Sequence, residues 1–228
     1  WASTDAADKP SLKQLINDNI SRLKKANKTS PLVLKAEGCA LLMEGDERDY
    51  MTGLGILETA VEQIDSMKAY DTDLYFRLAQ AYLRVPESRD RQTGQAAKML
   101  QRVIDIQPRD VLSRQLLIKV LHDERKYDQA LTHINFFIEN KISVSGLASD
   151  QIIALLGVGS QDKARELVNA MSEATTADRL SKARLATMAR MNVVADNLMR
   201  RLNQEELAAG SKEYPGTIML IQALARDR

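Results

Sequence analysis

Residues 72–108, TDLYFRLAQAYLRVPESRDRQTGQAAKMLQRVIDIQP, place apolar and small side chains at the spacing of two consecutive helices. In the first helix these side chains belong to Tyr75, Leu78, Ala79 and Tyr82. In the second they belong to Ala96, Leu100 and Val103. Because residues three or four apart share one face of a helix, this stretch predicts a helical hairpin packed through these two faces.

The face of the second helix recurs along the chain with a period of 34 residues. The small residue that opens each copy is Ala96, Ala130 or Ala164. Apolar residues follow each alanine four and seven positions later, at Leu100 and Val103, Ile134 and Phe137, and Val168 and Met171. An earlier copy, nine residues out of register, has Gly53, Leu57 and Ala60. Small residues let paired helices approach closely, so the period predicts a chain of similar hairpins.

The pattern Tyr75-x2-Leu78-Ala79-x2-Tyr82, followed by Ala96-x3-Leu100-x2-Val103 and Pro108, resembles the signature of the tetratricopeptide repeat (TPR) family. The resemblance covers residues 31–175, about four repeats, and is strongest in the second and third. It is interrupted by five inserted residues within 85–94 and by Ile142 in place of a closing proline.

The resemblance implies an all-α, right-handed α-solenoid that forms one continuous domain over residues 1–228. An N-terminal helix is expected within residues 1–30. A degenerate repeat and capping helices are expected within residues 176–228, the last helix beginning near Pro215.

Composition agrees with an all-α class and excludes several kinds of function. Aromatic residues make up 4% of the chain, and 32 Lys+Arg against 31 Asp+Glu leave a formal charge of +1. Bulk charge therefore gives no reason to expect a nucleic-acid partner. The longest apolar stretches, residues 152–159 and 217–223, are shorter than the ~18–20 residues of a membrane span. The single cysteine, Cys39, excludes an internal disulfide framework.

The chain begins with Trp1 rather than Met, as expected of a mature or trimmed product that has lost a signal or anchor. We expect a soluble domain, and its compartment and oligomeric state stay open.

Signatures of catalysis are absent from the sequence: it has no glycine-rich phosphate loop, no G-x-S-x-G, no H-E-x-x-H and no EF-hand loop. Its two histidines, His122 and His133, fall on different predicted helices, and His122 is interpreted as a solvated residue at a helix end. Cys39 follows Gly38 in a closely packed helix and is interpreted as a small buried apolar residue. We therefore expect a protein that is not an enzyme and uses no cofactor or metal.

A stack of helical hairpins provides a concave surface lined by the first helix of each repeat. The residues predicted to line it are Phe76, Arg77, Gln80, Leu83, Arg84, Gln115, Lys119, His122, Ser149 and Ile153, with Asp73 and Leu112 on the same face. Apolar patches beside positive charge suit an extended or helical peptide segment of a partner protein. The sequence thus predicts a scaffold, adaptor or assembly factor.

Two alternatives stay open. In the first, the chain's own helices fill the groove. In the second, the chain is an assembly module of a larger complex or homo-oligomer and uses its convex face or its C-terminal helices.

TPR domains that hold the C-terminal carboxylate of chaperones resemble one another in a set of five basic and amide residues. The corresponding residues here are Lys35, Cys39, Arg77, Leu112 and Leu116. Only the lysine matches, so the resemblance disfavours such a clamp. Arg77 and Lys119 remain candidates for receiving an acidic ligand.

Overall fold

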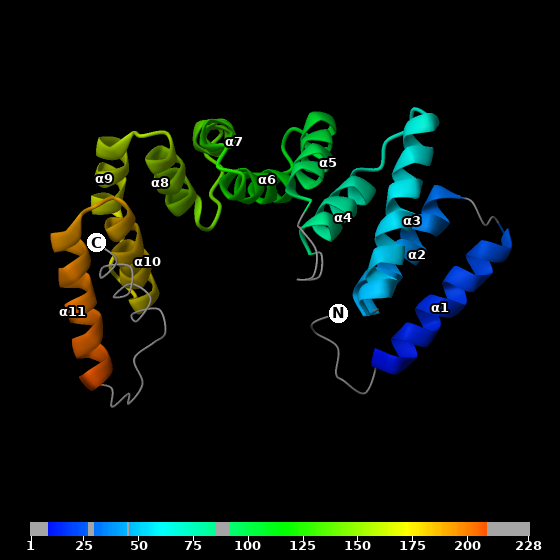
Figure 1. The fold of residues 1–228 in the computed structure, drawn as a ribbon, viewed down its shortest axis with the longest axis horizontal. Helices are drawn as coiled ribbons and strands as arrows, with labels where there is room; N and C mark the ends of the chain where they lie inside the picture. Colours follow the sequence, from blue (N-terminus) through cyan, green and yellow to red (C-terminus); the bar gives the residue numbers. More distant parts are fainter. Residues whose placement is uncertain (1–8, 27–29, 45, 85–91, 209–228) are drawn as a thin grey trace. The chain divides into compact units, whose positions relative to one another are not determined.

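The structure is a computed structural model that describes residues 9–26, 30–44, 46–84 and 92–208. These residues form helices joined by short turns, without a strand among them (Figure 1). The helices are α1 (Lys9–Ala26), α2 (Pro31–Glu44), α3 (Glu47–Ser66), α4 (Thr72–Leu83), α5 (Thr93–Ile106), α6 (Val111–Asp123), α7 (Tyr127–Glu139), α8 (Leu147–Gly157), α9 (Gln161–Ala170), α10 (Thr176–Met188) and α11 (Asn192–Ala208). The predicted all-α class is confirmed. The helix predicted from about Pro215 lies outside the described residues.

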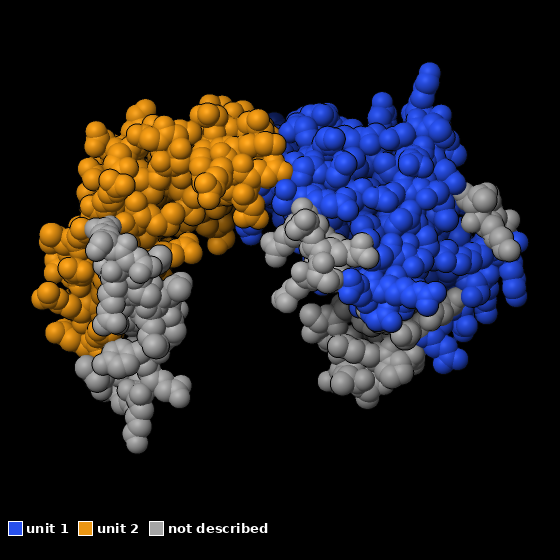
Figure 2. Space-filling view, in the orientation of Figure 1, with its two compact units in different colours: residues 1–120 blue, residues 121–228 orange. Residues whose placement is uncertain are grey.

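The chain divides into two compact units, residues 1–120 and residues 121–228 (Figure 2). In the first unit α2 packs against α3, and α4 packs against α5. In the second unit α8 packs against α9, and α10 against α11. These four pairs agree with the predicted hairpin pattern. A single continuous domain over residues 1–228 stays a prediction.

The 34-residue period corresponds to a buried face that recurs on α5, α7 and α9. The buried members of the three copies are Ala96, Leu100, Val103, Ala130, Ile134, Phe137, Ala164 and Val168, while Met171 is half-buried. The first-helix residues Tyr75, Leu78, Ala79 and Tyr82 are buried as well. Burial of these faces supplies the hydrophobic stabilisation that isolated helices of 10 to 14 residues lack.

Two glycines set the distance between α2 and α3. A Cβ atom built on Gly53 would lie 2.9 Å from the carbonyl oxygen of Gly38 and 2.9 Å from Cβ of Leu41. A Cβ atom on Gly38 would likewise lie 2.9 Å from the carbonyl oxygen of Gly53. The backbones therefore approach more closely than any side chain at these positions would permit.

Five helices end in the same left-handed turn. The residue with positive φ is Lys68, Arg125, Lys141, Gly159 or Arg190, with φ between 54° and 79°. In each turn the next amide donates to the carbonyl five residues before it, as from Ala69 to Ile64 at 3.1 Å. This is the Schellman pattern, in which glycine is the usual residue, yet a basic residue holds four of the five positions.

A polar cluster joins α3, α4 and α5 at the edge of the first unit. The hydroxyl of Tyr75 donates to Asp65 Oδ1 at 3.1 Å, and Arg102 Nη1 donates to Asp65 Oδ2 at 3.0 Å. The Arg102 guanidinium also lies 4.4 Å from the centre of the Tyr75 ring. The hydrogen bonds from Arg102 are the main reason that the pKa of Asp65 lies below its ordinary value.

Candidate functional site

Helix α4 is the element that presents the candidate site. One face of α4 is buried in the core of the first unit through Leu74, Tyr75 and Leu78. Asp71 caps its N-terminus by accepting a hydrogen bond from the amide of Leu74 at 2.9 Å. Because the helix is fixed by its buried face and its cap, its opposite face is held outward.

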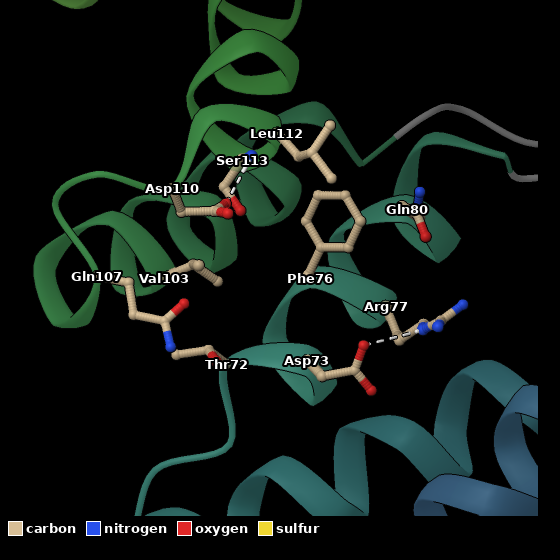
Figure 3. A pocket seen from close by; sticks show the side chains of 10 residues that line it. All are labelled: Thr72, Asp73, Phe76, Arg77, Gln80, Val103, Gln107, Asp110, Leu112 and Ser113. Atoms are coloured by element: carbon tan, nitrogen blue, oxygen red, sulfur yellow. Dashed lines mark hydrogen bonds and ion pairs between the residues drawn. The ribbon is translucent and has the colours of Figure 1, made fainter.

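A hollow of about 380 Å³ lies beside this outward face within the first unit. It is lined from α4, the α5–α6 turn and the neighbouring parts of α5 and α6, by Thr72, Asp73, Phe76, Arg77, Gln80, Val103, Gln107, Asp110, Leu112 and Ser113. Figure 3 shows the Phe76 ring beside the Leu112 side chain, and Val103 also lines the hollow. Leu112 is 64% exposed although its side chain is apolar. The hollow is therefore lined both by apolar side chains and by polar ones, and we call the polar lining residues its polar rim.

The carboxylates of this hollow are already engaged. Asp73 accepts from Arg77 Nε at 3.3 Å and pairs with Lys35 Nζ at 2.8 Å. Asp110 accepts from the amide of Ser113 at 2.8 Å and so caps α6. Burial opposes the ionised form of Asp73, but its contacts with Lys35 and Arg77 outweigh burial and lower its pKa. Both side chains thus serve the local structure.

The ammonium group of Lys35 forms ion pairs with two aspartates, Asp73 of α4 and Asp71 at the N-cap of that helix. Its Nζ lies 2.9 Å from Asp71 Oδ2 and 2.8 Å from Asp73 Oδ2. Burial disfavours its charge, but the hydrogen bonds to Asp73 and Asp71 prevail, and the pKa of Lys35 is raised. The one residue that matches the carboxylate clamp is therefore paired within the chain.

A second hollow, of about 80 Å³, continues along α4. It is lined by Cys39, Leu42, Met43, Tyr50, Arg77, Gln80, Ala81 and Arg84. Arg77 and Gln80 line both hollows. We call the two hollows together, with this shared wall, the α4 groove. Tyr50 is fixed at its edge because its hydroxyl donates to the carbonyl of Ala81 at 2.6 Å.

Cys39 is half-buried in the second hollow rather than fully buried, which corrects the sequence-based interpretation. Burial is the main cause that raises the pKa of its thiol. The thiolate, which is the nucleophilic form, is therefore disfavoured at this position.

The structure brings four of the ten predicted lining residues into the α4 groove: Phe76, Arg77, Gln80 and Arg84. Of the others in the first unit, Leu83 and Gln115 are half-buried and Lys119 is exposed, and none of the three lines either hollow. Sequence reasoning missed the wall built by Thr72, Val103, Gln107, Asp110 and Ser113. The only sequence signal for that wall is the break between helices at residues 107–110, because turn residues often border binding surfaces.

The remaining three predicted residues, His122, Ser149 and Ile153, belong to the second unit. The side chain of His122 is 11% exposed, and its Nδ1 lies 3.9 Å from Asp150 Oδ1. Burial lowers its pKa against the opposing charges of Asp150 and Asp123, so the interpretation as a solvated residue is wrong. Ile153 is partly buried against the core of the second unit, and Ser149 is half-buried.

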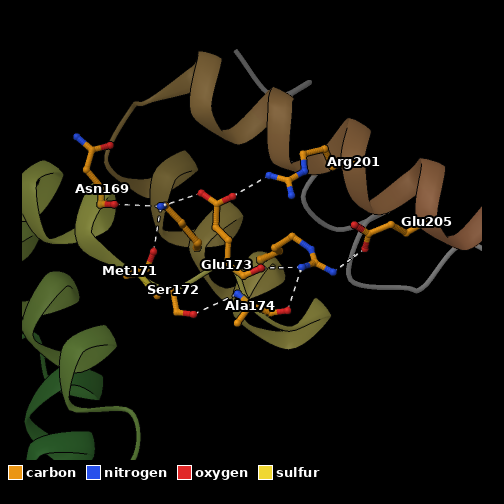
Figure 4. A network of polar contacts seen from close by, with 9 residues as sticks. Asn169, Met171, Ser172, Glu173, Ala174, Arg201 and Glu205 are labelled. Carbon is orange, nitrogen blue, oxygen red and sulfur yellow. Dashed lines mark hydrogen bonds and ion pairs between the residues drawn. The ribbon is translucent and has the colours of Figure 1, made fainter.

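The second unit also contains a polar network around a buried lysine that sequence reasoning missed (Figure 4). Lys182 Nζ donates to the carbonyls of Asn169 and Met171 at 3.1 Å each and to Glu173 Oε1 at 2.9 Å. The other oxygen of Glu173 accepts from Arg201 of α11 at 2.8 Å. The network thus ties the α9–α10 connection to both following helices.

The described residues contain neither a cluster of metal ligands nor a membrane-spanning helix. No group of three or more His, Cys, Asp or Glu side chains in these parts of the chain is placed to hold a metal ion. No helix among them is long and apolar enough to cross a membrane.

Comparison with known proteins identifies the fold. No protein-family model and no curated protein sequence matches the chain. Among solved structures it is similar to a tetratricopeptide repeat protein from Parabacteroides merdae ATCC 43184, with TM-score 0.50 and 10% identity over 95% of this chain and 78% of that one. It is also similar to the structure described as MamA MSR-1 C2, with TM-score 0.53 and 16% identity over 83% of this chain and 99% of that one. Together with its paired helices and its periodic core, these similarities identify the chain as having the tetratricopeptide-repeat fold.

Proposed function

We propose that the chain is a non-catalytic interaction module that binds a peptide segment of a partner protein in the α4 groove. The observation that carries the proposal is the hollow of about 380 Å³ in which Phe76 lies beside the largely exposed Leu112. Covering such apolar surface is favourable by about 25 cal/mol per Å². An apolar side chain of a partner would cover both residues at once.

The polar rim suits binding better than catalysis. Asp73 and Asp110 are held by Lys35, Arg77 and the amide of Ser113, so neither is placed to act as a general acid or base. Gln80 and Gln107 offer amide donors and acceptors at the rim, which suit the backbone of a bound segment. Gln115, Lys119, Ser149 and Ile153 stay predicted contacts outside the two hollows.

The test is a selection of random 12-residue peptides displayed on phage against the purified chain. Peptides that bind should lose affinity by at least about tenfold on the Leu112→Glu variant, since a carboxylate would replace an apolar contact. Leu112 is largely exposed, so this variant should keep its circular dichroism spectrum. The matched control is Val193→Glu, which changes a 74% exposed apolar side chain in the second unit. Equal binding to both variants would refute the proposal.

The exposure of two apolar side chains, Met188 and Val193, favours the alternative function, which is assembly of a larger complex or a homo-oligomer. These exposed apolar side chains lie at the end of α10 and the start of α11. If α11 mediates assembly, the mass measured by sedimentation should rise with concentration, and Val193→Glu should abolish that rise while Leu112→Glu should not. The proposed function predicts that Val193→Glu leaves both the mass and peptide binding unchanged.

A further inference from the structure

We infer that the α4 groove selects an extended segment in which an internal carboxylate side chain lies about three or four residues from an apolar side chain. The inference rests on the proposed function and specifies the chemistry of the partner.

The two ends of the groove differ in chemistry. At one end Phe76, Leu112 and Val103 form an apolar site. At the other end Arg84 lies beside Met43 and Tyr50. Since Arg77 and Gln80 belong to both hollows, a single segment can contact the two ends without leaving the groove.

Among the described residues, Arg84 is the charge in the groove that pairs with no group of opposite sign. Arg77 pairs with Asp73, whereas no carboxylate in the described parts of the chain forms an ion pair with the exposed Arg84. The nearby hydroxyl of Tyr50 is already engaged, because it donates to the carbonyl of Ala81. A guanidinium at the edge of a hollow forms its strongest hydrogen bonds with a carboxylate, so this end favours an acidic side chain.

The spacing follows from the helix that carries both ends. Phe76 and Arg84 are eight residues apart, and eight residues of α-helix rise about 12 Å. An extended chain advances about 3.3 Å per residue, so about three to four residues of a bound segment cover that distance. The carboxylate of the segment should therefore lie that far from its apolar residue.

The carboxylate should belong to a side chain rather than to a chain terminus. Lys35, the one residue here that matches the clamp for terminal carboxylates, is held by Asp71 and Asp73. Arg84 lines the second hollow and has no ion-pair partner among the described residues, and a single guanidinium places no requirement on where the segment ends.

The experiment repeats the peptide selection on the wild-type chain and on Arg84→Gln, with Lys98→Gln as the control. Lys98 is an exposed cation of α5 in the same unit, lines neither hollow and is not a predicted contact. Peptides enriched on the wild type should share an apolar residue with Asp or Glu about three or four positions away. Arg84→Gln should enrich the apolar residue without the acidic one, and Lys98→Gln should match the wild type.

Synthetic peptides then measure the effect by fluorescence polarisation. Changing the acidic residue to its amide should weaken binding about tenfold on the wild type and not on Arg84→Gln, a loss typical of one charge-assisted hydrogen bond. A free and an amidated C-terminus should bind equally. Enriched peptides that need Leu112 but lack the acidic residue, or that need a free C-terminus, would overturn the inference and leave the proposed function standing. Failure to enrich any peptide that depends on Leu112 would refute both.

Discussion

Replacing Gly53 with alanine should destabilise the first unit, whereas the same change two residues later should stabilise it. At Gly53 a new Cβ would lie 2.9 Å from two atoms of α2, the carbonyl oxygen of Gly38 and Cβ of Leu41. At Gly55 a new Cβ would meet no atom within 4 Å. The two positions share one helix and one chemical change, so only the contact with α2 distinguishes them.

The magnitudes follow from two opposing terms. Alanine in a helix interior is favoured over glycine by about 1 kcal/mol, which applies to both variants. Overpacking against a rigid neighbour costs about 1–3 kcal/mol, which applies to Gly53→Ala alone because backbone and Cβ atoms cannot rotate away. Gly55→Ala should therefore be more stable than Gly53→Ala by about 1–3 kcal/mol.

The assay is urea unfolding followed by circular dichroism at 222 nm, with hydrogen exchange of α2 and α3 to assign the change to the first unit. Amides of α2 and α3 should exchange faster in Gly53→Ala and more slowly in Gly55→Ala. Equal stability of the two variants, or a more stable Gly53→Ala, would show that the helices are not held at the described distance.

Three other substitutions test contacts described above. Tyr50→Phe removes the donor to the carbonyl of Ala81 and should lower the free energy of unfolding by about 1 kcal/mol, measured by urea titration; no change would mean that water replaces the hydroxyl. The folded pKa of Asp65 is lowered, so its stabilising effect is present above about pH 4 and is lost as the pH falls through that lowered value. Asp65→Asn should therefore cost up to about 1 kcal/mol at neutral pH, and its difference from the wild type should narrow as the pH falls below about 4; a difference that does not change with pH would contradict this. Lys182→Met removes the donor to two carbonyls and a carboxylate and should destabilise the second unit by about 2–3 kcal/mol. The loss should be seen as faster hydrogen exchange in α9 to α11. The control Lys163→Met changes an exposed lysine of the same unit and should alter the free energy of unfolding by less than about 0.5 kcal/mol.

The fold could be predicted because its core repeats. Ala96, Ala130 and Ala164 are spaced by one repeat length and are all buried, so a periodic pattern in the sequence corresponds directly to a periodic packing face. The same pattern identified the outward face of α4, since a helix with one buried face presents the other. Phe76, Arg77, Gln80 and Arg84 followed from that register.

The rest depends on contacts between residues far apart in sequence. Periodicity does not reveal that Lys35 pairs with Asp73, or that the His122 side chain is largely buried and lies close to Asp150. Nor does it reveal that the α5–α6 turn contributes a wall to the hollow beside Phe76. Lys182 illustrates the same limit, because a lysine is expected on a helix surface until three acceptors surround it.

The left-handed turns at the helix ends are positions at which substitution could raise the thermal stability of the chain. A non-glycine residue in this conformation costs on the order of 1 kcal/mol, and Lys68, Arg125, Lys141 and Arg190 all adopt it. Part of that cost is offset, because a cation near the carbonyl end of a helix gains about 0.3–1 kcal/mol. Glycine at all four turns would relieve the backbone and remove four positive charges from a chain whose formal net charge is +1. Glycine at these turns would thus relieve backbone strain and at the same time shift the isoelectric point to acidic values. Stability and net charge therefore change together at these sites.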